Sequence, residues 1–203
     1  MKSLRLESIA KLVSCDTVFD VGADHGELEV ILSNNKDINK IYAIENKKGP
    51  FEALNKKVME NHLDKVETLY SNGIKDLPKH KLSLIIAGMG GINIVNILLE
   101  YKENLEFAKE IILAPHSDYE ILRRVMVTLG YRIDKEVDVT ENDKDYLITR
   151  FVKGNMEYTQ NEYTYGIKGE YHRRKMIIEL KRSNENKKSK QLEAKIRRLE
   201  DEN

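Results

Sequence analysis

The sequence is poor in cysteine, proline and tryptophan and has no long apolar run. Of its 203 residues, one is cysteine (Cys15), three are proline and none is tryptophan. A single cysteine excludes a disulfide or a cysteine metal cluster within these residues, and it favours a reducing, cytoplasmic compartment. The first residues, MKSLRLESIAKLV, lack the apolar core of a signal peptide, and no segment approaches the roughly 18 apolar residues of a membrane span. We therefore expect neither secretion nor a membrane partner.

The sequence also lacks the short motifs of several enzyme classes. It contains no H-E-x-x-H, C-x-x-C, G-K-[ST] or G-x-S-x-G, so hydrolase, kinase and zinc-enzyme chemistry have no support. The five histidines, at positions 25, 62, 80, 116 and 172, do not show the spacing of metal ligands. We predict no metal site.

Net charge is absent from the chain as a whole but not from its carboxyl-terminal part. Lysine plus arginine and aspartate plus glutamate each number 34, yet residues 173–198 carry 11 basic and 3 acidic side chains. A basic segment at one end predicts a polyanionic partner such as a nucleic acid. The alternative is a helix whose lysines and arginines only keep it soluble, and charge alone favours this alternative.

The first 150 residues alternate short β-branched runs with longer amphipathic segments. The short runs are almost wholly apolar, as in buried parallel strands, whereas the longer segments repeat apolar residues at helical spacing. Strand and helix in alternation predict an α/β fold, with a parallel sheet covered on both faces. The expected strands are Val18–Val21, Ile41–Ile44, Val66–Tyr70, Leu82–Ala87 and Ile111–Ala114, and the expected helices are Leu4–Val13, Pro50–Glu60, Ile92–Leu99 and Tyr119–Leu129.

The pattern changes after Gly130, where a helix is expected to end. Two extended runs, Tyr131–Thr140 and Tyr146–Val152, predict an antiparallel hairpin at the edge of the sheet. The hairpin brings the expected number of strands to about seven.

The last thirty or so residues are helical in pattern and heavily charged. Their apolar stripe, Leu192, Ile196 and Leu199, is too narrow to fold alone, so we expect Arg173–Leu180 to pack antiparallel to it. The predicted organisation is an α/β domain over residues 1–152, a linker over 153–171 and a basic helical coiled-coil arm over 172–203.

Two features after the first two expected strands predict a nucleoside site. The segment Asp20-Val21-Gly22-Ala23-Asp24-His25-Gly26 places a glycine at a strand-to-helix turn, where a ligand can approach the backbone. Asp24 stands where a dinucleotide fingerprint has its second glycine, so it favours a cationic ligand over a pyrophosphate. Asp24 capping the helix is the alternative. Glu45 ends the second strand at the distance expected of an acid that binds ribose hydroxyls.

Later strand ends carry further candidates. Asn72-Gly73 follows the third strand, where a polar group can meet an adenine ring, although a plain turn explains it equally well. Ala87-Gly88-Met89-Gly90-Gly91 follows the fourth strand, and its glycines leave room for two substrates to meet. His116 follows the fifth strand at the same edge of the sheet.

These motifs together resemble the bacterial tRNA (adenine-22-N1)-methyltransferase family. The resemblance rests on FDVGADHGEL, AIENKKGPF, the Asn-Gly turn, IIAGMGG and ILAPHSDYEILRRVMVTLGYRI, with Ser3-x-Arg5-Leu6 and Lys144-Asp145-Tyr146 near the two ends of the region. It implies a Rossmann-like class I methyltransferase sheet followed by a helical coiled coil. It also implies methylation of N1 of an adenine in the D-arm of tRNA by S-adenosyl-L-methionine. The chain departs from the family in three places: Asn72-Gly73, where Asp-Gly is common, Ala114-Pro115-His116, where Gln-Pro-Asn is common, and the carboxyl-terminal arm, which is short for the family.

Carried over by position, the resemblance implies a cofactor site, and the residues themselves offer candidates for proton transfer and for contacts with tRNA. Asp24 is the candidate acceptor for the proton that the methylated base loses. Tyr146 and His116 are candidates to stack on an extruded adenine, because N1 is buried in folded tRNA. The implied cofactor-binding residues are Asp20, Gly22, Asp24, His25, Glu45, Asn72, Gly73, Ala87, Gly88, Met89 and Gly90, and the other candidate substrate contacts are Gly91, Arg173, Arg174, Lys175, Lys181 and Arg182.

The sequence leaves alternatives open. One is a methyltransferase of a protein or a small molecule, and another is a catalytically silent RNA-binding module on a Rossmann scaffold. NAD-dependent oxidoreduction is disfavoured, because the Asp24 carboxylate would repel a pyrophosphate. A monomer is the default expectation for the oligomeric state.

Overall fold

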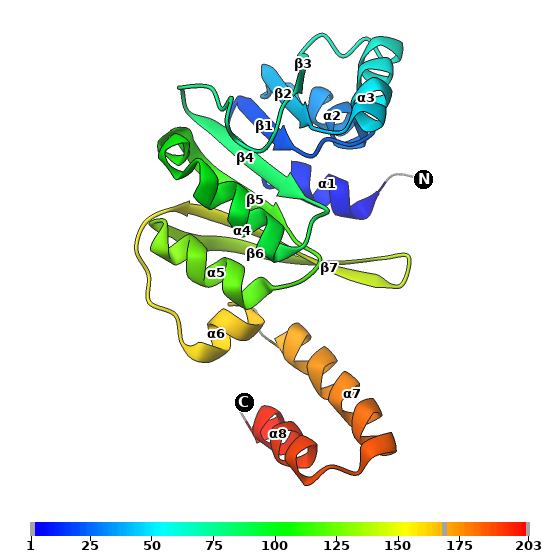
Figure 1. Ribbon diagram of the computed structural model, residues 1–203, viewed down its shortest axis with the longest axis vertical. Helices are drawn as coiled ribbons and strands as arrows, with labels where there is room; N and C mark the ends of the chain where they lie inside the picture. Colours follow the sequence, from blue (N-terminus) through cyan, green and yellow to red (C-terminus); the bar gives the residue numbers. More distant parts are fainter. Residues whose placement is uncertain (1–2, 168–169, 202–203) are drawn as a thin grey trace. The chain divides into compact units, whose positions relative to one another are not determined.

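A computed structural model describes residues 3–167 and 170–201 (Figure 1). The chain divides into two compact units, residues 1–156 and residues 157–203, which we call the sheet unit and the helical unit. Within the described ranges, no helix is both long enough and apolar enough to cross a membrane.

The sheet unit is built on one seven-stranded sheet with strand order β3-β2-β1-β4-β5-β7-β6. Strands β1 to β5 run parallel, and β7 pairs antiparallel with both β5 and β6. The α/β class, the seven strands and the hairpin at the edge of the sheet are therefore confirmed. The strands are β1 (Thr17–Val21), β2 (Lys40–Glu45), β3 (Val66–Tyr70), β4 (Leu82–Ala87), β5 (Ala108–Ala114), β6 (Tyr131–Glu141) and β7 (Lys144–Lys153).

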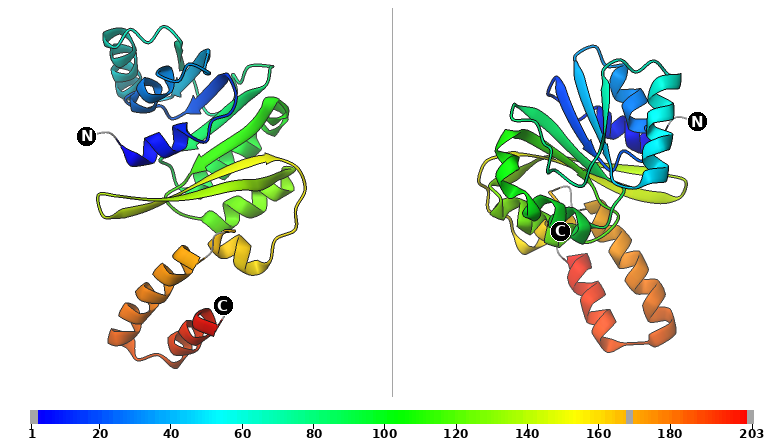
Figure 2. Two further views of the ribbon diagram at one scale, coloured as in Figure 1. Left: turned by 180° about the vertical axis from the view of Figure 1, so that it is seen from behind. Right: turned by 45° about the horizontal axis from the view of Figure 1, so that its top comes forward.

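Helices cover both faces of this sheet, α1 to α3 on one face and α4 and α5 on the other (Figures 1 and 2). Because the chain returns from β3 at one edge to β4 beside β1, the carboxyl ends of β1 and β4 form the topological switch point. The helices are α1 (Leu4–Ala10), α2 (Glu27–Ser33), α3 (Lys48–Glu60), α4 (Gly91–Glu100) and α5 (Tyr119–Thr128), with a 3-10 helix, η1 (Lys102–Phe107), that the sequence pattern did not predict.

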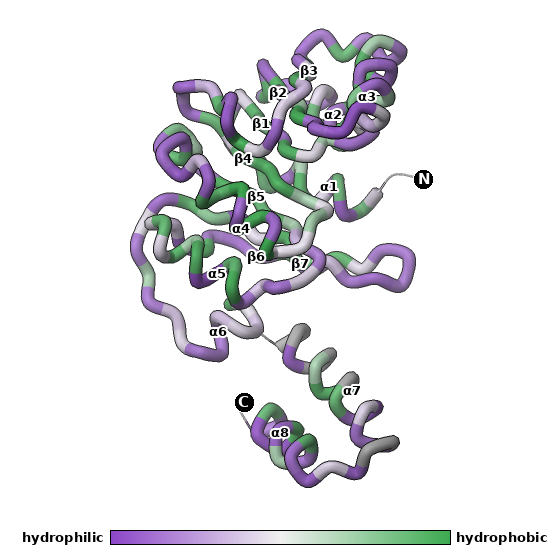
Figure 3. The backbone as a smooth tube through the Cα atoms, viewed as in Figure 1, coloured by the Kyte–Doolittle hydropathy of each residue, from purple (hydrophilic) through white to green (hydrophobic). Residues whose placement is uncertain are grey.

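The central strands are buried on both faces. All residues of β1 and all but the last of β4 are buried. Figure 3 shows β4 as largely hydrophobic, whereas the tip of the β6–β7 hairpin is hydrophilic. On the α1 face, Ile9, Leu32 and Ile85 are fully buried in one cluster. Two covered faces explain why these strands read as nearly continuous apolar runs.

Strand β3 differs from the prediction of a buried strand. It lies at the edge of the sheet and pairs only with β2, and Tyr70 at its end is 60% exposed. A short β-branched run is common to edge and central strands, so the local pattern does not distinguish them.

Several boundaries shift for local reasons. α1 ends before Val13, because Leu12 and Val13 donate to carbonyls three residues back and tighten the last turn. α3 begins at Lys48 rather than at Pro50, since proline is tolerated in the first turn of a helix. The hairpin turn is reduced to Asn142 and Asp143, both at positive φ (51° and 58°), which is typical of a type I′ turn.

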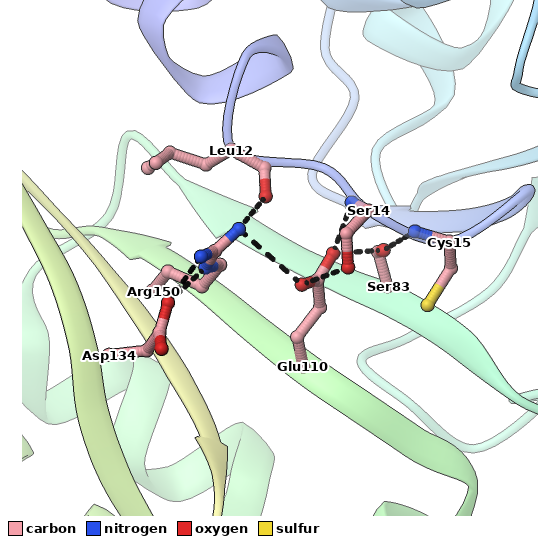
Figure 4. Close-up of polar contacts among 7 residues, drawn as sticks. All are labelled: Leu12, Ser14, Cys15, Ser83, Glu110, Asp134 and Arg150. Carbon is pink, nitrogen blue, oxygen red and sulfur yellow. Dashed lines mark hydrogen bonds and ion pairs between the residues drawn. The ribbon is translucent and has the colours of Figure 1, made fainter.

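A buried polar network closes the amino ends of the parallel strands (Figure 4). The Glu110 carboxylate is 2% exposed and accepts hydrogen bonds from Ser14 N (2.6 Å), Ser14 Oγ (2.7 Å) and Ser83 Oγ (2.5 Å). The Arg150 guanidinium pairs with Asp134 and lies 4.0 Å from Glu110. Each charge in this network therefore has a partner, as burial requires.

The helical unit contains three helices among its described residues: α6 (Gln160–Tyr165), α7 (Glu170–Lys187) and α8 (Lys190–Asp201). α7 and α8 contact each other, with Ile196 and Leu199 buried, and an ion pair of 2.6 Å joins Lys181 and Glu200. The segment predicted as a linker contains α6, which starts with a capping box between Thr159 and Glu162.

Candidate functional site

A cleft of about 860 Å³ opens at the carboxyl ends of β1 to β4. It lies at the topological switch point, where open α/β sheets bind ligands, and its volume is in the range of small-molecule sites. The sequence-predicted cofactor residues are brought together here: Asp20, Gly22, Asp24, His25, Glu45, Asn72, Gly73, Ala87, Gly88, Met89 and Gly90 all line the cleft.

The turn after β1 depends on Gly22. This residue has a φ of +78° and donates its N–H to Ile44 O at 2.9 Å. A Cβ at Gly22 would overlap Met89 Cε. Both the backbone conformation and the contact with the β4–α4 loop therefore favour glycine.

Asp24 does not cap α2, which was the alternative interpretation of this residue. The N-cap is Gly26, and it makes no side-chain capping hydrogen bond. The Asp24 carboxylate is 66% exposed and lies 3.6 Å from His25 Nε2. Asp24 is thus a solvated acid at the rim of the cleft, in a left-handed backbone conformation (φ 52°).

Glu45, at the end of β2, is held by backbone amides. Its side chain accepts hydrogen bonds from the N–H groups of Asn46 (2.9 Å), Lys47 (2.8 Å) and Asp24 (3.3 Å), and the residue is 6% exposed. Three donors fix the carboxylate before a ligand arrives and leave lone pairs for further donors. A pair of ribose hydroxyls would suit this acceptor.

Asn72 and Gly73 continue the wall of the cleft beyond β3. Asn72 Oδ1 accepts a hydrogen bond from Asn46 Nδ2 at 3.0 Å. Gly73 has a φ of +60°, and a Cβ there would lie 3.3 Å from Ile97. The Asn72-Gly73 turn is therefore hydrogen-bonded to the residue after β2 and packs closely against α4.

Asp20 and Glu29 form a buried pair of acids beneath the cleft. They are 4% and 0% exposed, and neither Glu29 oxygen has a hydrogen-bond donor among the described residues. Burial raises the pKa of Glu29 well above its usual value, and the neighbouring Asp20 charge raises it further. Burial also raises the pKa of Asp20, to about 6, against the lowering effects of the hydrogen bond to Glu29 and of Arg5. A proton on Glu29 supplies the missing donor to Asp20.

The glycines after β4 divide into two kinds. Gly88 has a φ of +76° and donates its N–H to Ala114 O at 3.1 Å, while a Cβ on Gly90 would make an ordinary contact with Ser117 Oγ at 3.4 Å. Gly91, predicted to contact substrate, does not line the cleft. A Cβ there would lie 2.5 Å from Ser117 O, so the described contacts of Gly91 are packing contacts.

The two aromatic residues predicted to hold the target base lie together beside the cleft. The rings of His116 and Tyr146 are 6.2 Å apart, and His116 N donates to Met89 O at 2.9 Å. Arg5, for which no role was predicted, lines the cleft and stacks on Tyr146, with its Cζ 5.1 Å from the ring centroid. Arg5 lies four residues before the buried Ile9 and therefore on the same face of α1. This spacing could have predicted that Arg5 faces the sheet.

The predicted tRNA-contacting residues after position 170 belong to the helical unit. Lys181 is paired with Glu200, Arg182 is exposed and Arg173 is half-buried. The side chains of Arg174 and Lys175 lie outside the described part of the structure. No three His, Cys, Asp or Glu side chains are grouped to hold a metal ion within the residues that were described.

Comparisons with known proteins agree with this geometry. A family described as "Methyltransferase domain" matches residues 2–149. The tRNA (adenine(22)-N(1))-methyltransferase of Bacillus subtilis is 29% identical over 147 residues, which cover 71% of this chain and 62% of that protein.

Two crystal structures from Streptococcus pneumoniae, described as a candidate tRNA (m1A22) methyltransferase, are similar along nearly the whole chain. One is 28% identical with a TM-score of 0.87 and covers 99% of this chain and 96% of that one. The other, in complex with S-adenosyl-L-methionine, is 26% identical with a TM-score of 0.86 and covers 98% of both chains. The chain therefore belongs to the methyltransferase-domain family, and it is similar to proteins named as tRNA (adenine(22)-N(1))-methyltransferases.

Proposed function

We propose that the protein methylates N1 of adenine 22 of tRNA with S-adenosyl-L-methionine as the methyl donor. The observation that carries the proposal is the cleft at the switch point, in which Glu45 is fixed by three backbone amides beside two glycine turns. The family relatives named for this reaction support the same activity.

The residues of the cleft fit this cofactor. Glu45 would accept hydrogen bonds from the ribose hydroxyls, and the amide of Asn72 would face the adenine. The lining carries four acids, which suit the sulfonium and the ammonium of the ligand: Asp20, Asp24, Glu27 and Glu45. The same carboxylates disfavour the pyrophosphate of NAD.

When bound, the cofactor supplies an electrophilic methyl group. The protein's task is then to hold the adenine N1 lone pair in line with it and to exclude water. Gly90 leaves open the space where the two reactants meet, and Asp24 at the rim would accept the proton that the product amine releases. The exposure of Asp24 gives that proton a path to solvent.

The target adenine has to leave the tRNA fold to reach the cleft. His116 and Tyr146 offer a stacking surface for the extruded base, tied to the β4–α4 loop through the hydrogen bond from His116 N to Met89 O. Tyr146 lies on β7 opposite Val139 of β6, in the hairpin whose tip is hydrophilic (Figure 3).

The α7–α8 pair is proposed as a coiled-coil arm that contacts the tRNA backbone. Its apolar residues Ile196 and Leu199 are buried, so charged side chains dominate what it presents. A tRNA substrate fits the cytoplasmic location that the sequence predicts. Four exposed cations of the arm serve for a test: Arg182, Lys190, Lys195 and Arg197.

Replacing these four cations by glutamine should reduce the slope of log Kd for tRNA against log salt by about 3–4. Cofactor affinity should not change. The matched control replaces four exposed lysines of the sheet unit: Lys11, Lys36, Lys56 and Lys79. An unchanged slope in the arm variant would show that its charge serves solubility only.

The activity itself is tested by incubating tRNA with labelled S-adenosyl-L-methionine and the full chain, followed by mass spectrometry of the nucleosides. We expect 1-methyladenosine at position 22 and none in a tRNA with guanine at that position. Label at another base, or as N6-methyladenosine, would reject the proposal.

A further inference from the structure

Glu29 is a buried acid that the proposed reaction does not use. It lies on α2, is 0% exposed, and neither of its carboxyl oxygens has a hydrogen-bond donor within the described ranges. The charged side chains that act on it, Asp20 and Glu27, are both acids. Since a buried carboxylate without a cation or a donor is strongly disfavoured, Glu29 retains its proton at neutral pH.

Asp20, on β1, is the acceptor for this proton. The two carboxyl groups are hydrogen-bonded to each other, and buried carboxyls in contact hold at least one proton between them. Asp20 is 4% exposed and lines the cleft, whereas Glu29 does not line it. Glu29 therefore acts on a ligand in the cleft through Asp20.

The hydrogen bond between the two acids controls the charge of Asp20. Burial raises the pKa of Asp20 to about 6, and the hydrogen bond with Glu29 and the attraction of Arg5 act against that rise. Without the donor, the pKa of Asp20 would rise further. A protonated Glu29 thus keeps Asp20 ionised at neutral pH, where its buried charge attracts a cation more strongly than a solvated carboxylate does.

The charge of Asp20 distinguishes the two small ligands of the proposed reaction. S-adenosyl-L-methionine carries a sulfonium, whereas its product, S-adenosylhomocysteine, carries a neutral thioether. The two molecules otherwise differ by one methyl group, and both would occupy the cleft that Asp20 lines. Comparing them therefore needs no assignment of which part of the ligand lies beside Asp20.

We propose that Glu29 is a positioning residue of this site: its proton, donated to Asp20, keeps that carboxylate ionised, so that the cleft prefers the cationic methyl donor over the product. The inference rests on the proposed function, because it takes the donor and its product as the ligands. It explains why a fully buried acid lies beneath a ligand site, where an apolar side chain would fill the space but leave Asp20 without its donor.

The test is calorimetry of both ligands with the full chain between about pH 5 and 8. In the wild type, the ratio of Kd for the product to Kd for the donor should rise about 3- to 10-fold as Asp20 ionises. Glu29→Gln, whose amide still donates to Asp20, should keep the midpoint of this rise. Glu29→Met has no donor, so its midpoint should move up by about one pH unit and its ratio near pH 6 should fall about 2- to 3-fold.

Other charged groups act on the pair or line the cleft: Arg5, Asp24, His25, Glu27, Glu45 and Lys47. An imidazole can change its charge in the same pH range, but every variant keeps all these groups, so their contribution to each profile is the same. The matched control is Glu52→Met, the same exchange at an exposed acid of α3, which should leave the midpoint unchanged.

Thermal melts establish that each variant is folded. A merely structural role of Glu29 would change the melting temperature without moving the midpoint of the ligand preference. If Glu29→Met does not fold, Asp20→Asn replaces it in the test: this variant removes the titrating group, so the rise of the ratio with pH should become smaller. An undiminished rise in a folded Asp20→Asn overturns the inference.

The same midpoint in the wild type, Glu29→Gln and Glu29→Met shows that Glu29 only packs, and it overturns the inference. A midpoint that moves equally in both Glu29 variants also overturns it, because the amide should replace the donor. If the wild type binds both ligands in a ratio that is independent of pH, the inference is wrong while the proposed function stands. A wild-type protein that binds neither ligand rejects the proposed function itself.

Discussion

The two ends of the parallel strands hold polar groups in opposite ways. At the amino ends, Glu110 accepts three hydrogen bonds and Arg150 donates to Asp134 and to Leu12 O. At the carboxyl ends, among the described residues, Arg5 Nε has no acceptor and the Glu29 oxygens have no donor. The protein alone satisfies the Glu110–Arg150 network, whereas these two groups at the carboxyl ends need a proton or a ligand to complete their hydrogen bonds. Buried polar groups stabilise the fold at the first end and prepare binding at the second.

The backbone of the loops at the carboxyl ends also differs from that of the amino-end network. The loops after β1, β3, β4 and β5 each contain a residue at positive φ, including the non-glycine residues Asp24 and Asp118. Such conformations cost free energy and are retained where loops must approach a ligand. The amino-end network contains none of these residues: Ser14, Ser83, Glu110, Asp134 and Arg150 all have ordinary φ values.

The largest expected effect is a loss of stability when the hydrogen-bonded network at the amino ends of the strands is broken. Glu110→Ala removes the acceptor of three hydrogen bonds and leaves buried donors and the Arg150 charge without it. We expect a loss of about 3–5 kcal/mol in the free energy of unfolding, measured by urea denaturation. Cofactor affinity of the folded fraction should be unchanged. A variant as stable as the wild type would contradict the assignment of this network to stability.

Two adjacent glycines at the start of α4, at the carboxyl ends of the strands, have different roles: Gly91 packs against the next loop, whereas Gly90 lines the cleft. Gly91→Ala should cost about 1–3 kcal/mol of stability, because its Cβ would overlap Ser117 O. Gly90→Ala should cost less than about 1 kcal/mol, and Gly90→Val should abolish methyl transfer while the protein remains folded. Denaturation and turnover are measured for all three variants. Near-normal turnover of a folded Gly90→Val would show that the turn only packs.

Glu45→Gln should weaken the cofactor by about 1–2 kcal/mol. The amide keeps one acceptor oxygen for the backbone but presents a donor to the ribose hydroxyls. Glu67→Gln, a half-exposed acid on the edge strand β3 that pairs with Lys40, is the control. Calorimetry that finds equal affinities for both variants would exclude Glu45 as the ribose acceptor.

The smallest expected effect is a pH dependence from the buried acids. Folding raises the pKa of Asp20 from 3.8 to about 6 and that of Glu29 well above its usual value. As the pH rises, the unfolded chain releases these two protons at a lower pH than the folded chain does. The stability that the bound protons contribute is therefore complete below about pH 4 and is lost as the pH rises through 6 and beyond. Arg5 and Glu27 also face this pair.

Glu29→Gln supplies a permanent donor to Asp20 and should reduce the loss of stability between pH 5 and 8 by about 1 kcal/mol. Urea denaturation at both pH values measures it. Glu52→Gln, an exposed acid of α3, is the control. Parallel pH profiles for Glu29→Gln and the wild type would mean that the acids do not share a proton.

Much of the fold and half of the site follow from short-range signals. The strand–helix alternation, the turns at Gly22 and Gly88 and the acid at Glu45 are recorded within a few neighbouring residues, so the sequence predicts them. The edge position of β3 was not predictable in this way. Whether a strand pairs with one neighbouring strand or with two depends on the strand order of the sheet, which a local pattern does not record.

The sequence by itself determined which elements form and which strand ends carry glycines and acids, since period and turn chemistry are local. Only the tertiary structure decided that Arg5 meets Tyr146, that Glu29 faces Asp20 and that Gly91 packs while Gly90 lines the cleft. Desolvation and pairing depend on neighbours that lie far away along the chain or on another element. The sheet brings these neighbours together, and no local pattern records them.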